Sequence, residues 1–532
     1  SLLVMLSTSL PSLVLADNLG DTNSFFADIT YDAFGRNQIT ASLRHISVHA
    51  YFYIEDEVWN NFSTIEREQY LTFAKELATE FDNRIYPLET SFFGSEPNPG
   101  VDNDPRVTIV LSNLRSSIGG YFNTGNEYRQ TDSAYSNQRE MFFLNAYISS
   151  HRRLSAFLAH EFQHMISFNQ KEIIRHTPED VWLNELRSEY AVTLLGYNEP
   201  YQGSTLERRT FVFSASRSDS LTEWKNESPD YAQVTLFGEF LAEKYGPQII
   251  AGTLKNSSSG MASLDDALAS FGLTIRHEDV FANWLYEIYL NDTLKIPPTR
   301  VVTGLGDTAP VSIEDQVIDW QGRWYILSDF AYGNNANLVI DFSSPSLLSF
   351  RVPYIIFYKD DRAELKNFYP SNANKTIFIS DIMANIDRIV IMPFKKDKLS
   401  GFSSNEIGTA FSMLISRTSA DAVQPPTLES LNLHEGDFIR AEGDQDVYII
   451  NSFGYKRIVL NSSICLLYRH LGDRGCFSAV KIVSPDVRDS FKTSNFYTNG
   501  ETNNGVIYEL QLIDNDHGRL VKIANNFAEF EK

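Results

Sequence analysis

The sequence predicts an α+β protein: a mixed sheet with helices, then a helical subdomain, then two β-rich domains. A chain of 532 residues is too long for one compact core. Its 43% hydrophobic and 21% charged residues are typical of a folded globular protein. Near residue 300 the apolar pattern changes from mixed helical and strand periods to short alternating runs, which indicates a change of fold class along the chain.

The first half alternates strand and helix signals. Residues 40–60 and 106–112 are rich in β-branched and aromatic residues and predict strands, as do 119–128 and 140–148. A helix is predicted over 63–85, with Ser63 as N-cap and Glu66 three residues later. Further helices are predicted at 153–168, at 179–196 with its end at Gly196, and in three patterns at 230–246, 262–272 and 277–292.

Four regions follow from this organisation. Residues 1–16 predict a secretory signal peptide, with an apolar run and a small residue, Ala16, at the cleavage zone, although the basic start is missing. We predict a main domain at 17–295, a β-sandwich-like domain at 305–420, and a β-rich module at 428–532 after a Pro-containing linker at 419–430. The alternative for the first residues is a buried strand. A signal peptide implies an exported protein.

Charge and hydropathy narrow the choice of partners. The net charge of −23 is spread along the chain, so nucleic acid and anionic membrane surfaces are not expected partners, because they require clustered Lys and Arg. No stretch reaches the ~18 apolar residues of a transmembrane helix. The only cysteines, Cys465 and Cys476, are either a local disulfide of an exported protein or two free thiols.

The stretch "FLAHEFQHMISFN" at 157–169 carries the strongest chemical signal. In a helix, His160 and His164 lie on one face, one turn apart, with Glu161 at the edge of that face. The opposite side holds an apolar stripe: Leu154, Leu158, Phe162, Met165 and Ile166. Two imidazoles at this spacing can share one zinc ion, and the adjacent carboxylate can then reach a bound water. The alternative is a chance pattern on a helix surface.

A second helix supplies the carboxylates that a catalytic zinc needs. Such an ion takes three protein ligands and keeps one open position. Glu185 and Glu189, in "VWLNELRSEYA", again lie one turn apart on one helical face. We predict Glu185 as the third ligand and Glu189 as an acceptor for the other ring N–H of a zinc-bound histidine. For Glu189 the alternative is a solvated helix carboxylate.

These motifs resemble a known enzyme group. The run from His160 to His164, followed by "WLNE", is similar to the gluzincin metallopeptidases, and within them to the hyicolysin-like family of secreted bacterial zinc peptidases. The likeness covers roughly residues 40–290 and includes "FDNRIYPLETSFFG", "GVDNDPRVTIVLS", "GGYFN", "SNQREMFFLN" and "DYAQVTLFGEFLAEKYG". A segment at 436–491 resembles a module of secreted or surface proteins of bacteria, for which attachment to a cell surface and a role as a spacer are the alternatives.

The resemblance implies a zincin-type domain and a zinc endopeptidase that cleaves proteins or peptides. It implies His160, His164 and Glu185 as zinc ligands and Glu161 as general base. It also implies an oxyanion-stabilising tyrosine or histidine, for which Tyr231 is our candidate, with an ordinary buried aromatic as the alternative. By analogy, "GGYFN" is expected to form a strand at the cleft edge that pairs with an extended substrate.

The sequence departs from the family at one point and leaves two alternatives. The family usually has Gly after the ligand glutamate, whereas Leu186 and Arg187 follow here, which predicts altered packing near the metal. One rival function is a surface adhesion or binding protein with a zincin fold and no turnover. The other is a gluzincin aminopeptidase, but its motif for a free substrate amine, a Gly-rich strand before the zinc helix, is absent here. "DNDP" (102–105) and "DNDHG" (514–518) carry oxygen ligands suited to Ca²⁺, but neither is an EF-hand loop, and turn formation explains both.

Overall fold

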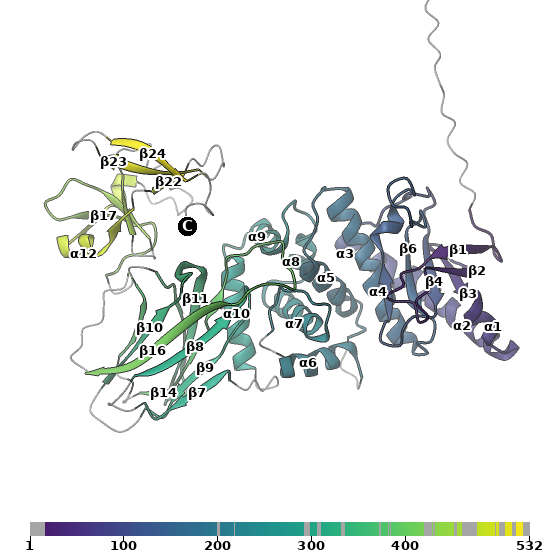
Figure 1. Ribbon diagram of the computed structural model, residues 1–532, viewed down its shortest axis with the longest axis horizontal. Coiled ribbons are helices and arrows are strands. Elements are labelled where there is room, and N and C mark those ends of the chain that lie inside the picture. Colours follow the sequence, from purple (N-terminus) through teal and green to yellow (C-terminus); the bar gives the residue numbers. More distant parts are fainter. Residues whose placement is uncertain are drawn as a thin grey trace, which may run out of the picture. The chain divides into compact units, whose positions relative to one another are not determined.

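The computed structural model describes residues 16–524 except 199–202, 217–218, 292–297, 306–309, 331–335, 372–373, 381, 383–384, 420–427, 429–430, 452–454, 460–475, 495, 499–505 and 513–517. The signal-peptide prediction, apart from Ala16, therefore lies outside the described residues, as do Cys465 and Asp514. The chain forms two compact units (Figure 1). The first holds 1–297, 318–322 and 396–407, and the second holds 298–317, 323–395 and 408–532.

The first unit contains a six-stranded mixed sheet in the order β1-β2-β3-β4-β6-β5. Its strands are β1 (Thr22–Phe26), β2 (Gln38–Ile46), β3 (Ala50–Glu55), β4 (Val107–Ser112), β5 (Gly120–Phe122) and β6 (Met141–Asn145). Strands β3, β4 and β6 are parallel, and β5 runs antiparallel to β6, with Tyr121 opposite Phe143. The short strand β5 thus forms one edge of the sheet.

Burial along the strands shows that both faces of the sheet are covered. All residues of β3, β4 and β6 are buried, which is typical of parallel strands between two layers. One face forms an apolar cluster of Phe25, Ile39, Ala41, Leu43, Tyr51, Tyr53, Val110, Leu114, Tyr121, Met141 and Phe143. On this unit, helix α2 packs on β2 and β3, and helix α4 packs on β5 and β6. The mixture of helices and sheets agrees with the predicted α+β class.

The helices of the first unit follow the predicted order with four additions. They are α1 (Asp56–Asn61), α2 (Thr64–Glu80), α3 (Tyr86–Phe93), α4 (His151–Ser167), α5 (Val181–Leu194), α6 (Thr205–Ser216), α7 (Ser228–Tyr245), α8 (Gln248–Gly252), α9 (Gly260–Ser270) and α10 (His277–Leu290). Ser63 and Glu66 form the predicted capping box at α2. Helices α1, α3, α6 and α8 were not predicted, and the strand predicted over 40–60 was wrong for residues 56–60, which lie in α1. In the part of the chain that the structure describes, no helix has the length and apolar character needed to cross a membrane.

Helix α4 is fixed by its cap and its apolar stripe. The Ser150 hydroxyl accepts a hydrogen bond from the Arg153 N–H at 3.3 Å and caps the helix. All five predicted stripe residues are fully buried. Among them, Phe162 packs edge-on against Phe81 and is stacked with Tyr86, with centroid separations of 5.1 and 5.5 Å. The helix then continues into a π-helical turn, η3 (Phe168–Ile173).

Two segments from the second half of the chain pack within the first unit. Trp320 is fully buried, donates from its indole N–H to the Lys398 carbonyl at 2.7 Å, and lies edge-on to His277 and Phe281. The Met261 N–H donates to the Leu399 carbonyl at 2.9 Å. Residues inside the predicted 305–420 region are therefore part of the first unit, and the domain limits given above stay predictions.

Most strand pairs of the second unit are antiparallel, whereas β7 and β9 are parallel. The order β13-β10-β16-β8 forms one sheet, and β12-β11-β14-β9-β7 forms another that β15 joins through β11. Their strands are β7 (Arg300–Thr303), β8 (Val311–Val317), β9 (Tyr325–Ser328), β10 (Ala336–Ser343), β11 (Phe350–Tyr358), β12 (Ala363–Phe368), β13 (Thr376–Ile379), β14 (Ile386–Ile391), β15 (Phe394–Lys395) and β16 (Thr409–Ser419). Side chains of both sheets share one apolar core, as in a sandwich.

The last hundred residues form two smaller sheets, β20-β17-β18-β19-β21 and β22-β23-β24. The strands are β17 (Phe438–Ala441), β18 (Tyr448–Ile450), β19 (Tyr455–Ile458), β20 (Lys481–Val483), β21 (Lys492–Thr493), β22 (Phe496–Thr498), β23 (Ile507–Leu512) and β24 (Gly518–Ala524), with helix α12 (Pro485–Ser490). Two small apolar clusters, around Phe438 and Ile439, lie in this region.

Helix α3 carries an unusual carboxyl group. Glu89 has 0% exposed surface, and neither of its carboxylate oxygens has a hydrogen-bond partner. Burial raises the pKa of this carboxyl well above its value of 4.5 in water. The folded state therefore binds a proton that the unfolded chain releases above that value, and stability is lost as the pH rises from 4.5 toward the folded pKa.

Glu89→Gln is expected to stabilise the protein increasingly as the pH rises. The amide is neutral at every pH, so the variant avoids a cost of about 1.4 kcal/mol per pH unit within that window. Melting temperatures of both proteins at mildly acidic and mildly alkaline pH test this, with similar values expected only at the acidic end. A difference that does not change with pH would contradict a buried, uncompensated carboxyl group.

Candidate metal centre

Helices α4 and α5 bring three predicted ligands together. His160 and His164 project from one face of α4, and Glu185 faces them from α5. The two Nε2 atoms are 3.1 Å apart, and Glu185 Oε2 lies 3.3 Å from His160 Nε2 and 3.6 Å from His164 Nε2. One donor atom from each residue lies within 4.8 Å of the others. The three side chains thus converge on one point between the helices.

This donor set fits a tetrahedral zinc ion. Zinc bonds of about 2.0–2.1 Å to nitrogen and oxygen separate neighbouring ligand atoms by about 3.3 Å, close to the separations seen here. Glu185 Oε2 is buried, and within the described residues only the two imidazoles lie beside it, which is costly for a carboxylate unless a cation meets it. Burial alone raises the pKa of Glu185, and the facing imidazoles outweigh burial and hold this pKa below its usual range.

The far side of His160 faces Glu189. His160 Nδ1 lies 3.9 Å from Glu189 Oε1, which is an electrostatic contact longer than a hydrogen bond. Glu189 instead accepts from Arg209 Nη2 at 2.6 Å and from the Thr235 hydroxyl at 2.9 Å. Its carboxylate is thereby held in place beside the imidazole by α6 and α7. The contact of Arg209 with Glu189 was not predicted, because the residues of α6 were not recognised as a helix from their sequence pattern.

The far side of His164 is occupied by a residue that sequence reasoning missed. Ser188 Oγ lies 3.0 Å from His164 Nδ1 and 2.7 Å from Gln163 Oε1. When the hydroxyl donates to Gln163, its oxygen accepts the Nδ1–H of His164, so Nε2 is left free for a metal. Ser188 follows Glu185 by three positions, and this i, i+3 spacing on α5 is the signal that would have found it.

Glu161 lies at the base of the centre, beside the edge strand β5. It is 5% exposed, and the Phe122 main-chain N–H is hydrogen-bonded to its carboxylate. A side chain at Gly120 would approach Glu161 Cγ to 2.9 Å, so this close approach requires glycine. Burial raises the pKa of Glu161 to about 8, opposed by His164 and reinforced by Glu185.

Tyr231 lies at the start of α7, on the side of the centre that Glu189 and Arg209 occupy. Its hydroxyl donates to Asn226 Oδ1 at 2.9 Å, and Arg209 lies over its ring, 4.6 Å from the centroid. Burial raises its pKa, and the carboxylates of Glu185 and Glu189 raise it further. The phenol therefore lies within the electrostatic field of the centre and stays protonated.

A cleft of about 340 Å³ opens beside His164 and Glu185. Strand β5 and the residues after it form one wall, and η3 forms another. The lining side chains include Tyr31, Tyr121, Phe122, Phe168 and Asn184. The predicted "GGYFN" segment is thus an edge strand that borders the metal centre, with aromatic groups beside it.

The departure from the family pattern at 186–187 is accommodated by neighbouring residues. Leu186 is fully buried, and a Cβ at Gly238 of α7 would lie 3.4 Å from its Cγ. A side-chain carbon at that distance would make an ordinary van der Waals contact, so Leu186 fills the space between α5 and α7 beside Gly238. Arg187 is also fully buried, and it donates to Glu179 Oε2 at 2.9 Å and to Thr253 Oγ1 at 3.1 Å.

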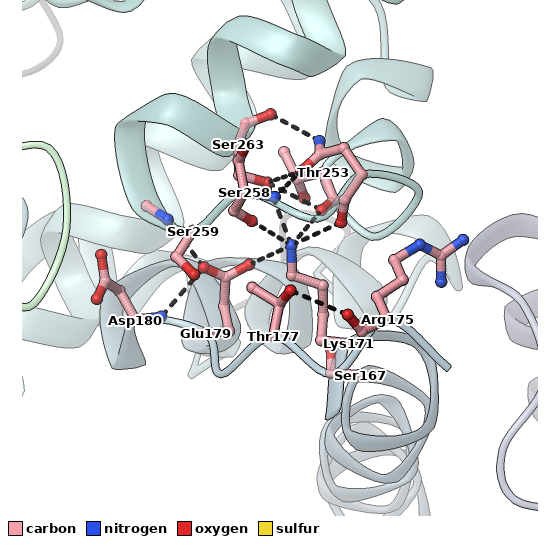
Figure 2. A network of polar contacts seen from close by, with 12 residues as sticks. Ser167, Lys171, Arg175, Thr177, Glu179, Asp180, Thr253, Ser258, Ser259 and Ser263 are labelled. Atoms are coloured by element: carbon pink, nitrogen blue, oxygen red, sulfur yellow. Dashed lines mark hydrogen bonds and ion pairs between the residues drawn. The ribbon is translucent and has the colours of Figure 1, made fainter. Parts of the chain in front are cut away.

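Figure 2 shows how Lys171 joins this polar network. Its ammonium group donates to the carbonyls of Thr253, Asn256 and Ser258 at 3.1, 3.2 and 2.5 Å and lies 3.3 Å from Glu179 Oε2. Burial lowers the pKa of Lys171, and Glu179 partly restores it. Lys171 follows α4, and Glu179 precedes α5, so these contacts connect the two ligand-bearing helices through residues 253–258.

The sequence is similar to a known metalloprotease. It is 29% identical over 222 residues to the neutral metalloprotease ShpI of Staphylococcus hyicus, and the match covers 37% of this chain and 48% of that protein. It therefore spans about half the length of this relative. No family model matches the chain. The match supports a relationship to metallopeptidases.

Solved structures give only distant matches. A periplasmic lysozyme inhibitor, PliG of Aeromonas hydrophila, is 7% identical, with a TM-score of 0.16 over 22% of this chain and 98% of that one. A family GH115 glucuronidase, BtGH115A, is 7% identical, with a TM-score of 0.13 over 59% and 51% of the two chains. Scores this low carry no structural argument.

Lys171→Met is expected to lower the free energy of unfolding by about 3–5 kcal/mol, because it leaves three carbonyls without their buried donor and removes one of the two cations beside Glu179, where only Arg187 remains. Urea unfolding followed by tryptophan fluorescence measures the change. Lys75→Met, at an exposed position of α2, is the control and is expected to stay within about 0.5 kcal/mol of the wild type. Equal effects of the two substitutions would show that the Lys171 network contributes nothing specific.

Proposed function

We propose that this protein is an exported zinc-dependent endopeptidase of the hyicolysin-like gluzincin type. The convergence of His160, His164 and Glu185 beside the buried Glu161 carries this proposal. The similarity to a neutral metalloprotease supports it. The rival, a zincin-fold binding protein without turnover, does not require a carboxylate in the position of Glu161.

Each side chain has a distinct role in the proposed reaction. When bound, zinc supplies a Lewis acid and lowers the pKa of a water molecule to about 7. Glu161 takes the proton of the attacking water and passes it to the amine of the departing product. The Tyr231 hydroxyl turns from Asn226 and donates to the oxyanion that develops at the scissile carbonyl. Glu189 and Ser188 hold the two imidazoles in their orientation.

The cleft supports an extended peptide as substrate. Strand β5 pairs with β6 on one side; on the other side the Phe122 N–H is hydrogen-bonded to Glu161, and the remaining main-chain groups of that edge are offered to a substrate strand. Phe122 and Tyr31 add aromatic surface for substrate side chains. A peptide bound in this way loses affinity when one of its main-chain amides is replaced by an ester, which can be measured with an inactive variant.

The remaining regions receive accessory roles in this proposal. The zincin-type domain comprises 17–295, and the β-rich regions at 305–420 and 428–532 attach the enzyme to a bacterial cell surface or present it to its substrate.

Removal of 428–532 is therefore expected to release surface-bound protein into the medium without loss of peptide cleavage in vitro. A truncated protein that stays bound to cells would show that another part of the chain carries the attachment.

Glu161→Gln is expected to keep one zinc per chain and to lose peptide cleavage by a factor of about 10²–10⁴ in kcat/KM, because the amide cannot accept a proton. Zinc content and cleavage of casein or a quenched peptide are measured side by side. Glu243→Gln, an exposed change on α7, is the matched control and is expected to retain full activity.

The outcomes of this experiment separate the two functions. Zinc in both proteins with cleavage only in the wild type supports the peptidase. Zinc in both with no cleavage of a broad peptide library by either supports the binding protein. Folded wild-type protein that binds no zinc contradicts the metal centre itself.

Tyr231→Phe is expected to lower kcat by about 10²–10³ with little change in KM, because its hydroxyl acts only on the oxyanion. Steady-state kinetics with one peptide measure both constants. Tyr245→Phe, which removes a hydroxyl at the other end of the same helix, controls for general damage to α7. A rise in KM at constant kcat would instead make Tyr231 a substrate-binding residue.

A further inference from the structure

A second cavity, of about 710 Å³, lies at the start of helix α4. It opens where strands β4 and β6 end, between the loop at 113–116 and the segment 145–153. It shares no lining residue with the cleft beside the metal centre. One segment borders both, because Tyr31 lines the cleft and Ala33 lines the cavity. The volume is that of a small-ligand site.

The lining of this cavity is positively charged. It includes Arg115 and Arg153, which are both exposed, and the described lining residues include no Asp or Glu. The chain as a whole has 68 acidic residues and 45 Lys and Arg residues, so this lining runs against its composition. Serine side chains at 116, 149 and 150 add hydroxyl groups. The cavity therefore favours an anionic group.

Neither arginine is neutralised by a carboxylate of the described residues. Arg115 donates from Nε to the Asp32 carbonyl at 3.3 Å and from Nη2 to the Ile29 carbonyl at 3.4 Å. These contacts orient its guanidinium without cancelling its charge. Arg153 lies over the Phe157 ring, 5.7 Å from the centroid. Both side chains thus keep a full charge to offer to a ligand.

Hydrogen bonds hold the loop that carries Arg115 in place. Asn145 is 3% exposed and donates from Nδ2 to the Ile118 carbonyl at 2.8 Å and to the Arg115 carbonyl at 3.2 Å. The Arg115 N–H donates to the Tyr31 carbonyl at 2.9 Å. A wall that is already ordered loses little conformational entropy when a ligand binds.

The N-terminus of α4 adds positive potential on the same side. This helix has 17 residues, and Arg153 lies in its first turn, where the Ser150 hydroxyl caps it. The dipole of a helix places partial positive charge at this end. It acts on the cavity together with the two guanidinium groups.

The accessible side of α4 leads from the metal centre to this cavity. Between residues 153 and 167, only Arg153, Phe157, His160 and His164 are not buried. Their spacing of four, three and four residues places them on one face of the helix. Arg153 precedes His160 by seven residues, a rise of about 10 Å along the helix. An extended peptide covers that distance in about three residues.

The edge strand β5 follows the same line. A Cβ on Gly119 would lie 2.3 Å from the Phe157 ring, and one on Gly120 would lie 2.9 Å from Glu161 Cγ. The strand and the helix therefore run in the same direction, from the cavity toward the metal centre. A peptide paired with β5 and extended past Gly119 reaches the cavity.

We propose that this cavity binds the carboxylate of an Asp or Glu side chain of the substrate, about three residues from the scissile bond. The inference rests on the proposed peptidase function and adds to it a preference for acidic sequences. Arg153 and Arg115 are the residues that determine this preference. Guanidinium groups bind a carboxylate through charge-assisted N–H···O bonds, so they discriminate Glu from its neutral isostere Gln.

Peptide cleavage by the full-length, zinc-loaded protein tests the preference. One peptide sequence with acetylated and amidated ends carries a single Glu at each position in turn on both sides of the scissile bond, and a matched set carries Gln. We expect kcat/KM to be about tenfold higher with Glu than with Gln around the third position on one side only. High salt should reduce this ratio. A Glu effect of equal size at every position would reflect overall charge and overturn the proposal.

Charge reversal identifies the residues. Arg153→Glu is expected to abolish the preference for Glu, because the introduced carboxylate neutralises Arg115, and the double variant Arg153→Glu with Arg115→Gln is expected to prefer Lys at the same position. Lys244→Glu, the same charge change at an exposed position of α7, is the matched control and should keep the wild-type preference. Equal shifts in Arg153→Glu and Lys244→Glu would contradict the assignment.

Binding to the zinc-loaded Glu161→Gln variant separates this inference from the proposed function. Calorimetric titration with the Glu and Gln peptides is expected to give a Kd about tenfold lower for Glu. The same binding preference without cleavage by the wild type would contradict the peptidase and keep the cavity as a site for acidic side chains. Cleavage without a preference in either assay would overturn the cavity and keep the peptidase. A preference confined to peptides with a free C-terminus would assign the cavity to the terminal carboxylate and overturn the side-chain proposal.

Discussion

The packing of α4 against α5 is the contact on which the candidate centre depends. Helix α4 uses one side for the apolar core, where Phe162 meets Phe81 and Tyr86. Its other side must then meet a polar partner, and α5 supplies one with Glu185 and Ser188. A shift of half a turn between these helices would move the carboxylate out of reach of both imidazoles.

Buried charges at the ends of these helices set their relative position. Lys171 is held by main-chain carbonyls that cannot be moved without unfolding residues 253–258, and Glu179 connects it to Arg187. Such contacts contribute little net stability compared with an apolar core, but any other arrangement leaves a charge unpaired. They therefore favour one register of α4 and α5 over its neighbours, and that register brings the metal ligands together.

The same reasoning separates the carboxylates of this protein into two kinds. Glu189 has Arg209, and Glu179 has Lys171 and Arg187, so these groups are compensated within the chain. Glu185 is of the second kind, because within the described residues its buried Oε2 meets only the two imidazoles, an arrangement that fits a metal ion.

Local spacing in the sequence predicted the parts of the site that lie on single helices. His160 and His164 follow from the period of α4, and Glu185 follows from that of α5, because each relation spans only one turn. The apolar stripe and the Ser63 cap were predictable for the same reason. The positions of the predicted ligands relative to one another needed the structure, since they depend on how two helices pack.

Contacts between distant residues escaped prediction. Arg209 reaches Glu189 from a helix that the sequence pattern did not reveal, and Lys171 binds carbonyls more than eighty positions away. Carbonyl groups leave no trace in side-chain patterns, so such a site cannot be recognised from residue types.

The residues that follow Glu185 separate the packing of α5 from its ligand side. Leu186 is fully buried and lies beside Gly238 of α7, and Arg187 is fully buried against Glu179 and Thr253. Ser188, next along the helix, lies beside His164 again. Because an α-helix turns by about 100° per residue, the positions directly after a ligand point away from the metal and the position three residues later returns to it. Side chains at 186 and 187 therefore determine how α5 packs, whereas those at 185 and 188 meet the imidazoles.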